Sequence, residues 1–206
     1  CLSGGRFILG AGTGYIEPEF RTLGIPFADR GDRMDEYIRV LHQVWSTDGA
    51  QSFHGRFVQF DGMHVEPRPV QRPWPPIWVA GNGPRVLRRA VELAEGWHPL
   101  EPPLAELEAG IARMEALCVK TGRQRRPYVS ICFRRLCFGP TAHMAGTGAD
   151  RRMLNGSTMD VLHDLRELRK RGVGHLVVRF MPGDRGWRDV EEAMRLFANV
   201  RGEVGD

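Results

Sequence analysis

The sequence has few cysteines and no long apolar run. Its cysteines are Cys1, Cys118, Cys132 and Cys137, with no Cys-x-x-Cys pair and no histidine spacing that completes a metal site. We therefore expect reduced core thiols and no bound metal. No stretch approaches the ~18 uncharged apolar residues of a membrane helix, and no secretory signal opens the chain. These absences predict a cytoplasmic protein without a membrane partner.

The sequence also lacks a large excess of positive or negative charge, because its formal net charge is only +4. The basic runs "RQRRP" and "RELRKR" contain no interleaved aromatic residues, so we do not expect nucleic-acid binding. A mild excess of arginine suits an anionic small molecule. The composition thus favours a small-molecule substrate as the partner.

Short apolar segments alternate with amphipathic ones along the chain. This alternation predicts a parallel sheet covered by helices, which is an α/β fold. A hairpin around Gly55 and a mobile, glycine-rich loop at 139–156 interrupt the alternation. Strands are expected at 6–10, 77–80, 96–100, 127–138 and 174–180, and helices within 24–47 (capped by Asp29 or Asp32), 84–94, 103–122, 157–173 (capped by Ser157) and 187–200.

Two glycine-rich turns, "GAGTGY" at 10–15 and "AGNGPRV" at 80–86, each follow an expected strand and precede a helix. Ligands of α/β proteins bind at this edge of the sheet, where glycine lets backbone N–H groups come close and a helix start attracts anions. The second turn predicts a phosphate cradle, with Arg85, Arg88 and Arg89 as anion partners. A tight turn also needs glycine for steric reasons alone. The spacing does not match the dinucleotide pattern GxGxxG, so we reject that interpretation.

Taken in order, three stretches resemble the bacterial luciferase-like superfamily, which includes flavin monooxygenases and deazaflavin-dependent oxidoreductases. They are "LSGGRFILGAGTGYIEPEFRTLGIPFADRGDRMDEYIRVLHQVW", "FHGRFVQF" and "PRPVQRPWPPIWVAGNGPRVLRRAVELAEGW". The resemblance implies a single (β/α)8 TIM-barrel domain over 1–206 with an insertion at about 46–76. Only the last five βα units are expected here. The first three would be missing or supplied elsewhere, by a partner segment or within a homodimer.

The resemblance also implies a cofactor, coenzyme F420 or alternatively FMN, lying across the carboxyl ends of the strands. The implied function is hydride transfer between F420 and a small organic substrate. The alternatives are an FMN-dependent luciferase-like monooxygenase and a non-catalytic flavin-binding remnant of a barrel. The residues that match the cofactor-binding turns are Gly12, Thr13, Gly14, Tyr15, Ala80, Gly81, Asn82 and Gly83.

No catalytic acid or base can be nominated, because the resemblance implies that most residues near the reacting carbon come from the three absent strands. His98 and Glu19 are weak candidates, and His98 fits a structural histidine better. Tyr15 fits a cofactor contact and a packed aromatic equally well. We expect the tryptophans Trp74, Trp78 and Trp97 to belong to the core.

Overall fold

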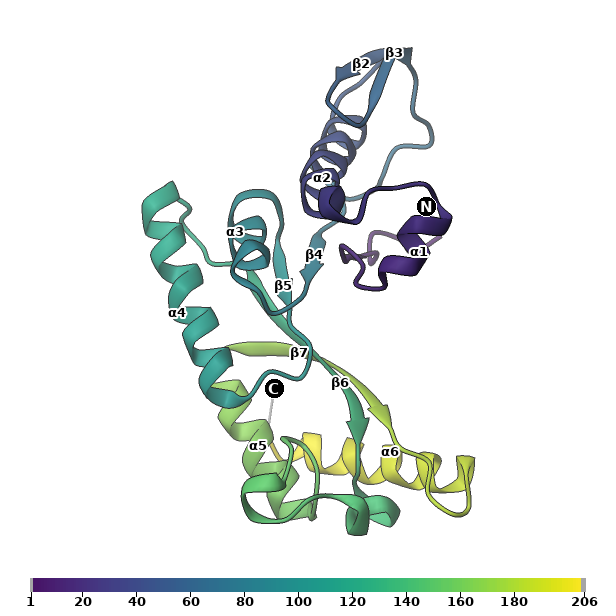
Figure 1. Ribbon diagram of the computed structural model, residues 1–206. Helices are drawn as coiled ribbons and strands as arrows, with labels where there is room; N and C mark the ends of the chain where they lie inside the picture. The colour runs from purple at the N-terminus through teal and green to yellow at the C-terminus, as the bar shows by residue number, and fades with distance from the viewer. Residues whose placement is uncertain (1, 205–206) are drawn as a thin grey trace. The chain divides into compact units, whose positions relative to one another are not determined.

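The computed structural model describes residues 2–204, so the prediction for Cys1 lies outside the described residues. It contains the five expected βα units in the expected order (Figure 1). The strand pairs β1–β4, β4–β5 and β6–β7 are all parallel, which confirms the α/β class. The units are β1 (Leu9–Ala11) with α1 (Glu17–Thr22) and α2 (Arg30–Ser46), β4 (Ile77–Ala80) with α3 (Pro84–Leu93), β5 (Gly96–His98) with α4 (Leu104–Thr121), β6 (Tyr128–Leu136) with α5 (Thr158–Lys170), and β7 (Val173–Phe180) with α6 (Trp187–Gly202).

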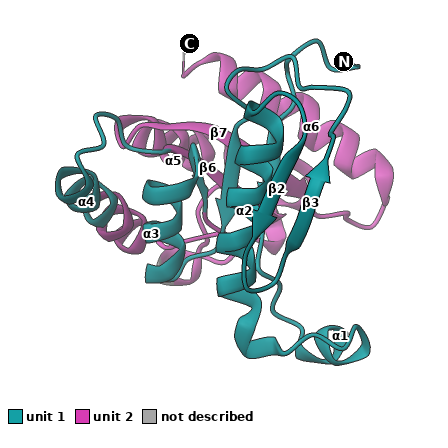
Figure 2. Cartoon of the chain, turned by 90° about the horizontal axis from the view of Figure 1, so that it is seen from above, with its two compact units in different colours: residues 1–98, 112–127 teal, residues 99–111, 128–206 magenta. Residues whose placement is uncertain are grey.

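The chain divides into two compact units (Figure 2). Unit 1 comprises residues 1–98 and 112–127 and holds the strands β1, β4 and β5 in that order. Unit 2 comprises residues 99–111 and 128–206 and holds the strands β6 and β7. The assignment of a single domain with an insertion at about 46–76 stays a prediction.

The core of unit 1 lies between its strands and α3. Ile77 and Val79 are 0% and 1% exposed and alternate with half-buried residues along β4. Because successive side chains of a strand point to opposite faces, one face of β4 is buried and the other is partly open. Helix α3 packs on β4 and β5 with an apolar stripe at helical spacing, formed by Leu87, Ala90 and Val91.

The core of unit 2 follows the same rule. Val129, Ile131 and Phe133 alternate along β6 and are buried. Helix α5 begins as predicted at Ser157, whose hydroxyl accepts a hydrogen bond from the Asp160 N–H at 3.2 Å. The Asp160 carboxylate in turn accepts the Ser157 N–H at 2.9 Å, which completes a capping box. The three described cysteines are free thiols, two of them buried, as expected for core cysteines.

Some boundaries differ from the prediction. Strand β1 begins at Leu9 rather than at residue 6, because its register sets Leu9 opposite Ile77. The residues before Leu9 would face Pro75 and Pro76, which have no N–H to donate to a ladder. Helix α1 and the short 3-10 helix η1 (Phe27–Asp29) were not predicted, and the expected loop at 139–156 holds the 3-10 helices η2 (Gly139–Met144) and η3 (Gly148–Asp150).

The hairpin expected around Gly55 is present. Strands β2 (Gln51–His54) and β3 (Gln59–Met63) pair antiparallel and lie beside α2 (Figure 1). The Glu36 carboxylate on α2 accepts the backbone N–H groups of Arg56, Phe57 and Val58 at 2.9, 2.7 and 2.7 Å. One side chain therefore holds the hairpin turn against the helix.

We expect acid to release this turn. Burial alone would raise the pKa of Glu36, but the three backbone donors outweigh it and hold the pKa below its ordinary 4.5. The stabilisation is thus present above pH 4.5 and is lost as the pH falls through the lower, folded pKa. Hydrogen-exchange protection of the 56–58 amides is expected to fall across that interval.

The Glu36→Gln variant is expected to lose the same protection at neutral pH, since an amide offers one acceptor oxygen in place of two. The matched control is Asp32→Asn on the same helix, whose carboxylate makes only a 3.8 Å ion pair with Arg56. Equal protection in Glu36→Gln and Asp32→Asn would contradict the assignment.

Candidate functional site

The two predicted glycine turns lie side by side at one edge of unit 1. Strands β1 and β4 run parallel, with Ala11 opposite Val79, so that Gly12 and Ala80 come next along each strand. A Cβ built on Gly12 would stand 3.8 Å from the Ala80 Cβ. This juxtaposition at the carboxyl edge of the strands is the one that the sequence predicted.

His98 belongs to the same edge. The register of β4 and β5 sets His98 opposite Ala80. Its ring stacks near that of Trp78, with centroids 6.4 Å apart and planes 26° apart, and both residues are half-buried. The edge therefore presents Gly12, Ala80 and His98 in one row across three strands.

The turn after β4 requires glycine at position 81. Gly81 has a φ of +128°, and a Cβ there would come within 3.1 Å of Val86 Cγ2. Its N–H donates to the His98 carbonyl at 3.2 Å, and its carbonyl accepts the Trp97 indole N–H at 2.9 Å. Trp97 is 2% exposed, as expected for a core tryptophan, and the hydrogen bond from its indole holds the turn in place.

Helix α3 begins directly after this turn without a side-chain cap. Gly83 is the N-cap residue and supplies no side-chain cap, and Pro84, which has no N–H, follows in the first turn. The Val86 N–H donates to the Gly83 carbonyl at 3.0 Å. A Cβ on Gly83 would meet no atom within 4 Å. The N-terminal end of α3 thus combines open space with the partial positive charge that favours a phosphate.

One of the three predicted anion partners, Arg89, is wrong. Arg89 is 4% exposed, forms an ion pair with Asp35 on α2, and donates to the Gly31 carbonyl at 2.9 Å. Arg88 also reaches Asp35, at 3.2 Å. Because Asp35 compensates its buried charge, Arg89 joins α3 to α2 and is not available to an anion. The Arg88 side chain is 52% exposed, so its anion contact stays a prediction. Arg85, which is exposed, stays a predicted anion partner.

The first turn is shaped by Gly14. Its φ is +77°, and a Cβ there would approach the Phe20 ring to 2.8 Å. Tyr15 is 79% exposed, so the alternative that its ring packs against other described residues is wrong. The contact between Tyr15 and the cofactor stays a prediction. Thr13 is half-buried and Glu19 is exposed on α1.

Three cavities of unit 1 lie away from these turns. One of about 480 Å³ is lined by Leu2, Phe7, Trp45, Val70 and other residues, and by none of the eight predicted cofactor residues. The candidate site is therefore defined by exposed backbone at the strand edge rather than by an enclosed cavity.

Within residues 2–204, no group of His, Cys, Asp or Glu side chains is arranged so that it could hold a metal ion. In the same residues no helix has the length and apolarity to span a bilayer.

Parallel βα units with adjacent glycine turns at the carboxyl edge are typical of barrel-type α/β proteins, which bind ligands at that edge. A family model described as luciferase-like monooxygenase matches residues 1–196. The chain therefore belongs to the luciferase-like monooxygenase family, and the resemblance inferred from the glycine turns is confirmed.

Among curated proteins, an FMNH(2)-dependent dimethylsulfone monooxygenase of Pseudomonas putida is 33% identical over 100 residues. The match covers 47% of this chain and 27% of that protein, so the chain spans about a quarter of this curated relative.

Two solved structures share the fold. The monooxygenase RslO1 from Streptomyces bottropensis has a TM-score of 0.79 at 19% identity, over 96% of this chain and 68% of that one. An F420-dependent secondary alcohol dehydrogenase in complex with an F420-acetone adduct has a TM-score of 0.80 at 15% identity, over 98% of this chain and 71% of that one. The relatives and structural neighbours named here are oxidoreductases.

Proposed function

We propose that this chain forms the cofactor-binding part of an oxidoreductase that transfers a hydride between coenzyme F420 and a small organic substrate. The observation that carries the proposal is the pair of adjacent turns at Gly12 and Ala80, beside the uncapped start of α3. The fold shared with the F420-dependent alcohol dehydrogenase supports the same assignment.

The residues present fit such a group. The backbone of 12–15 forms one wall, and the turn 80–83 with the start of α3 holds the phosphate, since the N-cap residue Gly83 supplies no side-chain cap there. Arg85 adds a positive charge next to that turn. The bound cofactor supplies the redox chemistry, while these residues position it against the strand edge.

A second candidate is a monooxygenase that uses reduced FMN. The observation in its favour is the 33% identity to the FMNH(2)-dependent dimethylsulfone monooxygenase, which covers 47% of this chain. The same turns suit an FMN phosphate, because a helix start binds any phosphate monoester or diester in the same way.

Fluorescence titration of the purified chain with oxidised F420 and, separately, with FMN tests both candidates. We expect saturable binding of F420 and a weaker signal with FMN. Saturable binding of FMN alone would replace the first proposal by the second. Binding of neither cofactor would contradict both and favour a barrel remnant without a cofactor. Hydride transfer itself is read from F420 absorbance with small alcohols or carbonyl compounds added.

A further inference from the structure

A second site lies in unit 2, directly after the carboxyl end of β6. A small pocket of about 190 Å³ opens there, and its lining includes Arg135, Cys137, Asp150, Arg152 and Asn155. From the sequence, Arg135 and Cys137 are expected in a strand and the other lining residues in the loop at 139–156. The pocket shares no residue with the glycine turns of unit 1, so what it binds is a separate question from the cofactor.

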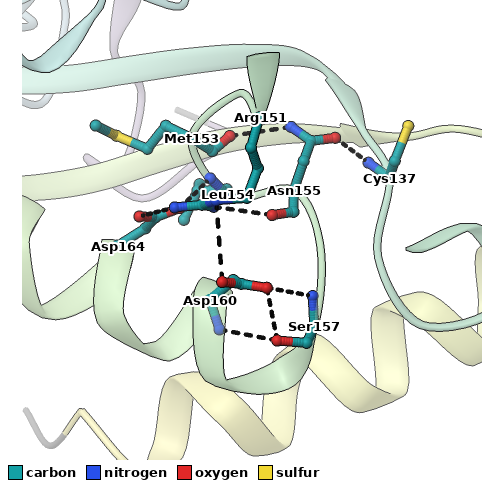
Figure 3. A network of polar contacts seen from close by, with 8 residues as sticks. All are labelled: Cys137, Arg151, Met153, Leu154, Asn155, Ser157, Asp160 and Asp164. Atoms are coloured by element: carbon teal, nitrogen blue, oxygen red, sulfur yellow. Dashed lines mark hydrogen bonds and ion pairs between the residues drawn. The ribbon is translucent and has the colours of Figure 1, made fainter. Parts of the chain in front are cut away.

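The wall of this pocket is fixed by a network of hydrogen bonds (Figure 3). The Asn155 side chain accepts the Cys137 backbone N–H at 2.5 Å and donates to the Met153 carbonyl at 3.0 Å. Asp164 on α5 accepts the Leu154 N–H at 2.7 Å, and Leu154 is fully buried. Segment 151–155 is therefore anchored both to α5 and to the strand end that carries Cys137.

The arginines of this region differ in how their charge is compensated. Arg151 binds both oxygens of Asp164, at 2.7 and 3.0 Å, so its charge is neutralised within the network (Figure 3). Neither Arg152 nor Arg135 forms an ion pair with any residue of the part of the chain that the structure describes. Asp150 is the only acidic residue in the lining, so the residues around the pocket carry two positive charges against one negative charge.

The size of the pocket limits what it can hold. A volume of about 190 Å³ corresponds to roughly six water molecules at ~30 Å³ each. Ligand sites for drug-sized molecules start at about 300 Å³, so a flavin ring system does not fit. Guanidinium groups pair best with the oxygens of carboxylates and phosphates. The fitting ligand is a small oxyanion head group.

We propose that this pocket binds the carboxylate or phosphate group of a small organic acid, with Arg135 and Arg152 providing the charge and the Asn155 network holding the wall in place. This goes beyond the cofactor assignment, because the pocket lies in unit 2 and its test involves no cofactor.

Cys137 serves as a reporter inside the pocket. The test compares its alkylation by iodoacetate, which is anionic, with alkylation by iodoacetamide, which is neutral, followed by peptide mass spectrometry. The ratio of the two rates cancels any change in the fraction of thiolate, because both reagents attack the same thiolate. We expect this ratio to fall several-fold in Arg135→Gln and in Arg152→Gln. Inorganic phosphate should protect Cys137 saturably at constant ionic strength.

The controls are Arg134→Gln and Arg166→Gln, each of which removes an exposed positive charge of unit 2 from outside the pocket. Equal ratios in all four variants would overturn the proposal, as would protection by phosphate no greater than by chloride. If the thiol reacts with neither reagent, calorimetry with inorganic phosphate decides. A saturating heat lost in Arg135→Gln and Arg152→Gln supports the site, and no such heat in the parent chain contradicts it.

Discussion

Replacing Gly83 by valine is expected to weaken cofactor binding by more than about tenfold, which is about 1.4 kcal/mol, without affecting the fold. Gly83 has a φ of −79° and a ψ of 162°, a conformation that any residue adopts, and a Cβ there meets no protein atom within 4 Å. The new methyl groups would instead occupy the space beside the start of α3, where the cofactor phosphate is proposed to lie. Fluorescence titration with F420 and with FMN measures the loss.

The matched control is Gly202→Val at the end of α6, where a Cβ also meets nothing within 4 Å. Gly83→Val should lose at most about 1 kcal/mol of stability, because valine is a poorer N-cap than glycine. Gly202→Val should keep the thermal midpoint of the parent chain, and only Gly83→Val should lose affinity. Full affinity in Gly83→Val for whichever cofactor binds the parent chain would place that cofactor elsewhere.

Replacing Asp35 by alanine is expected to cost about 3–5 kcal/mol of unfolding free energy, because it leaves the Arg89 guanidinium buried without a counter-charge. For a chain of this size that loss corresponds to roughly 6–20 °C in the thermal midpoint. Thermal and urea denaturation followed by circular dichroism measure the effect.

Arg88→Gln is the control for this pair. The Arg88 side chain is 52% exposed and also contacts Asp35, so its removal should cost less than about 1 kcal/mol. The double variant Asp35→Leu, Arg89→Met should recover most of the lost stability, since apolar residues of similar volume can replace a buried pair. An Asp35→Ala variant as stable as Arg88→Gln would refute the structural role of the pair.

The features that sequence reasoning predicted correctly have local signals. The buried strand at 77–80, the hairpin around Gly55 and the helix start at Ser157 each depend on residues within a few positions of one another. The adjacency of the two glycine turns also followed, because parallel strands bring their carboxyl ends to one edge. A local pattern and one topological rule were sufficient for these features.

The features that sequence reasoning missed depend on partners that are far away in the sequence. Arg88 and Arg89 bond to a carboxylate 53 and 54 positions away, so their spacing on α3 could not distinguish a structural arginine from an anion ligand. The start of β1 is set by prolines that precede β4. The pocket at Arg135 and Arg152 depends on how segment 151–155 folds back onto α5. The one available signal for the structural arginines was Asp35, an aspartate among the apolar positions of α2, since a buried acid implies a buried base.

The peptide at Gly81 is tethered on both sides, by the His98 carbonyl and by the Trp97 indole. Ordering one residue of backbone costs about 1–2 kcal/mol of conformational entropy, and this turn incurs that cost when the chain folds. Binding of the proposed cofactor at this turn is therefore expected to involve a rigid receptor. Its observed rate should increase in proportion to ligand concentration, with no plateau set by a preceding loop closure.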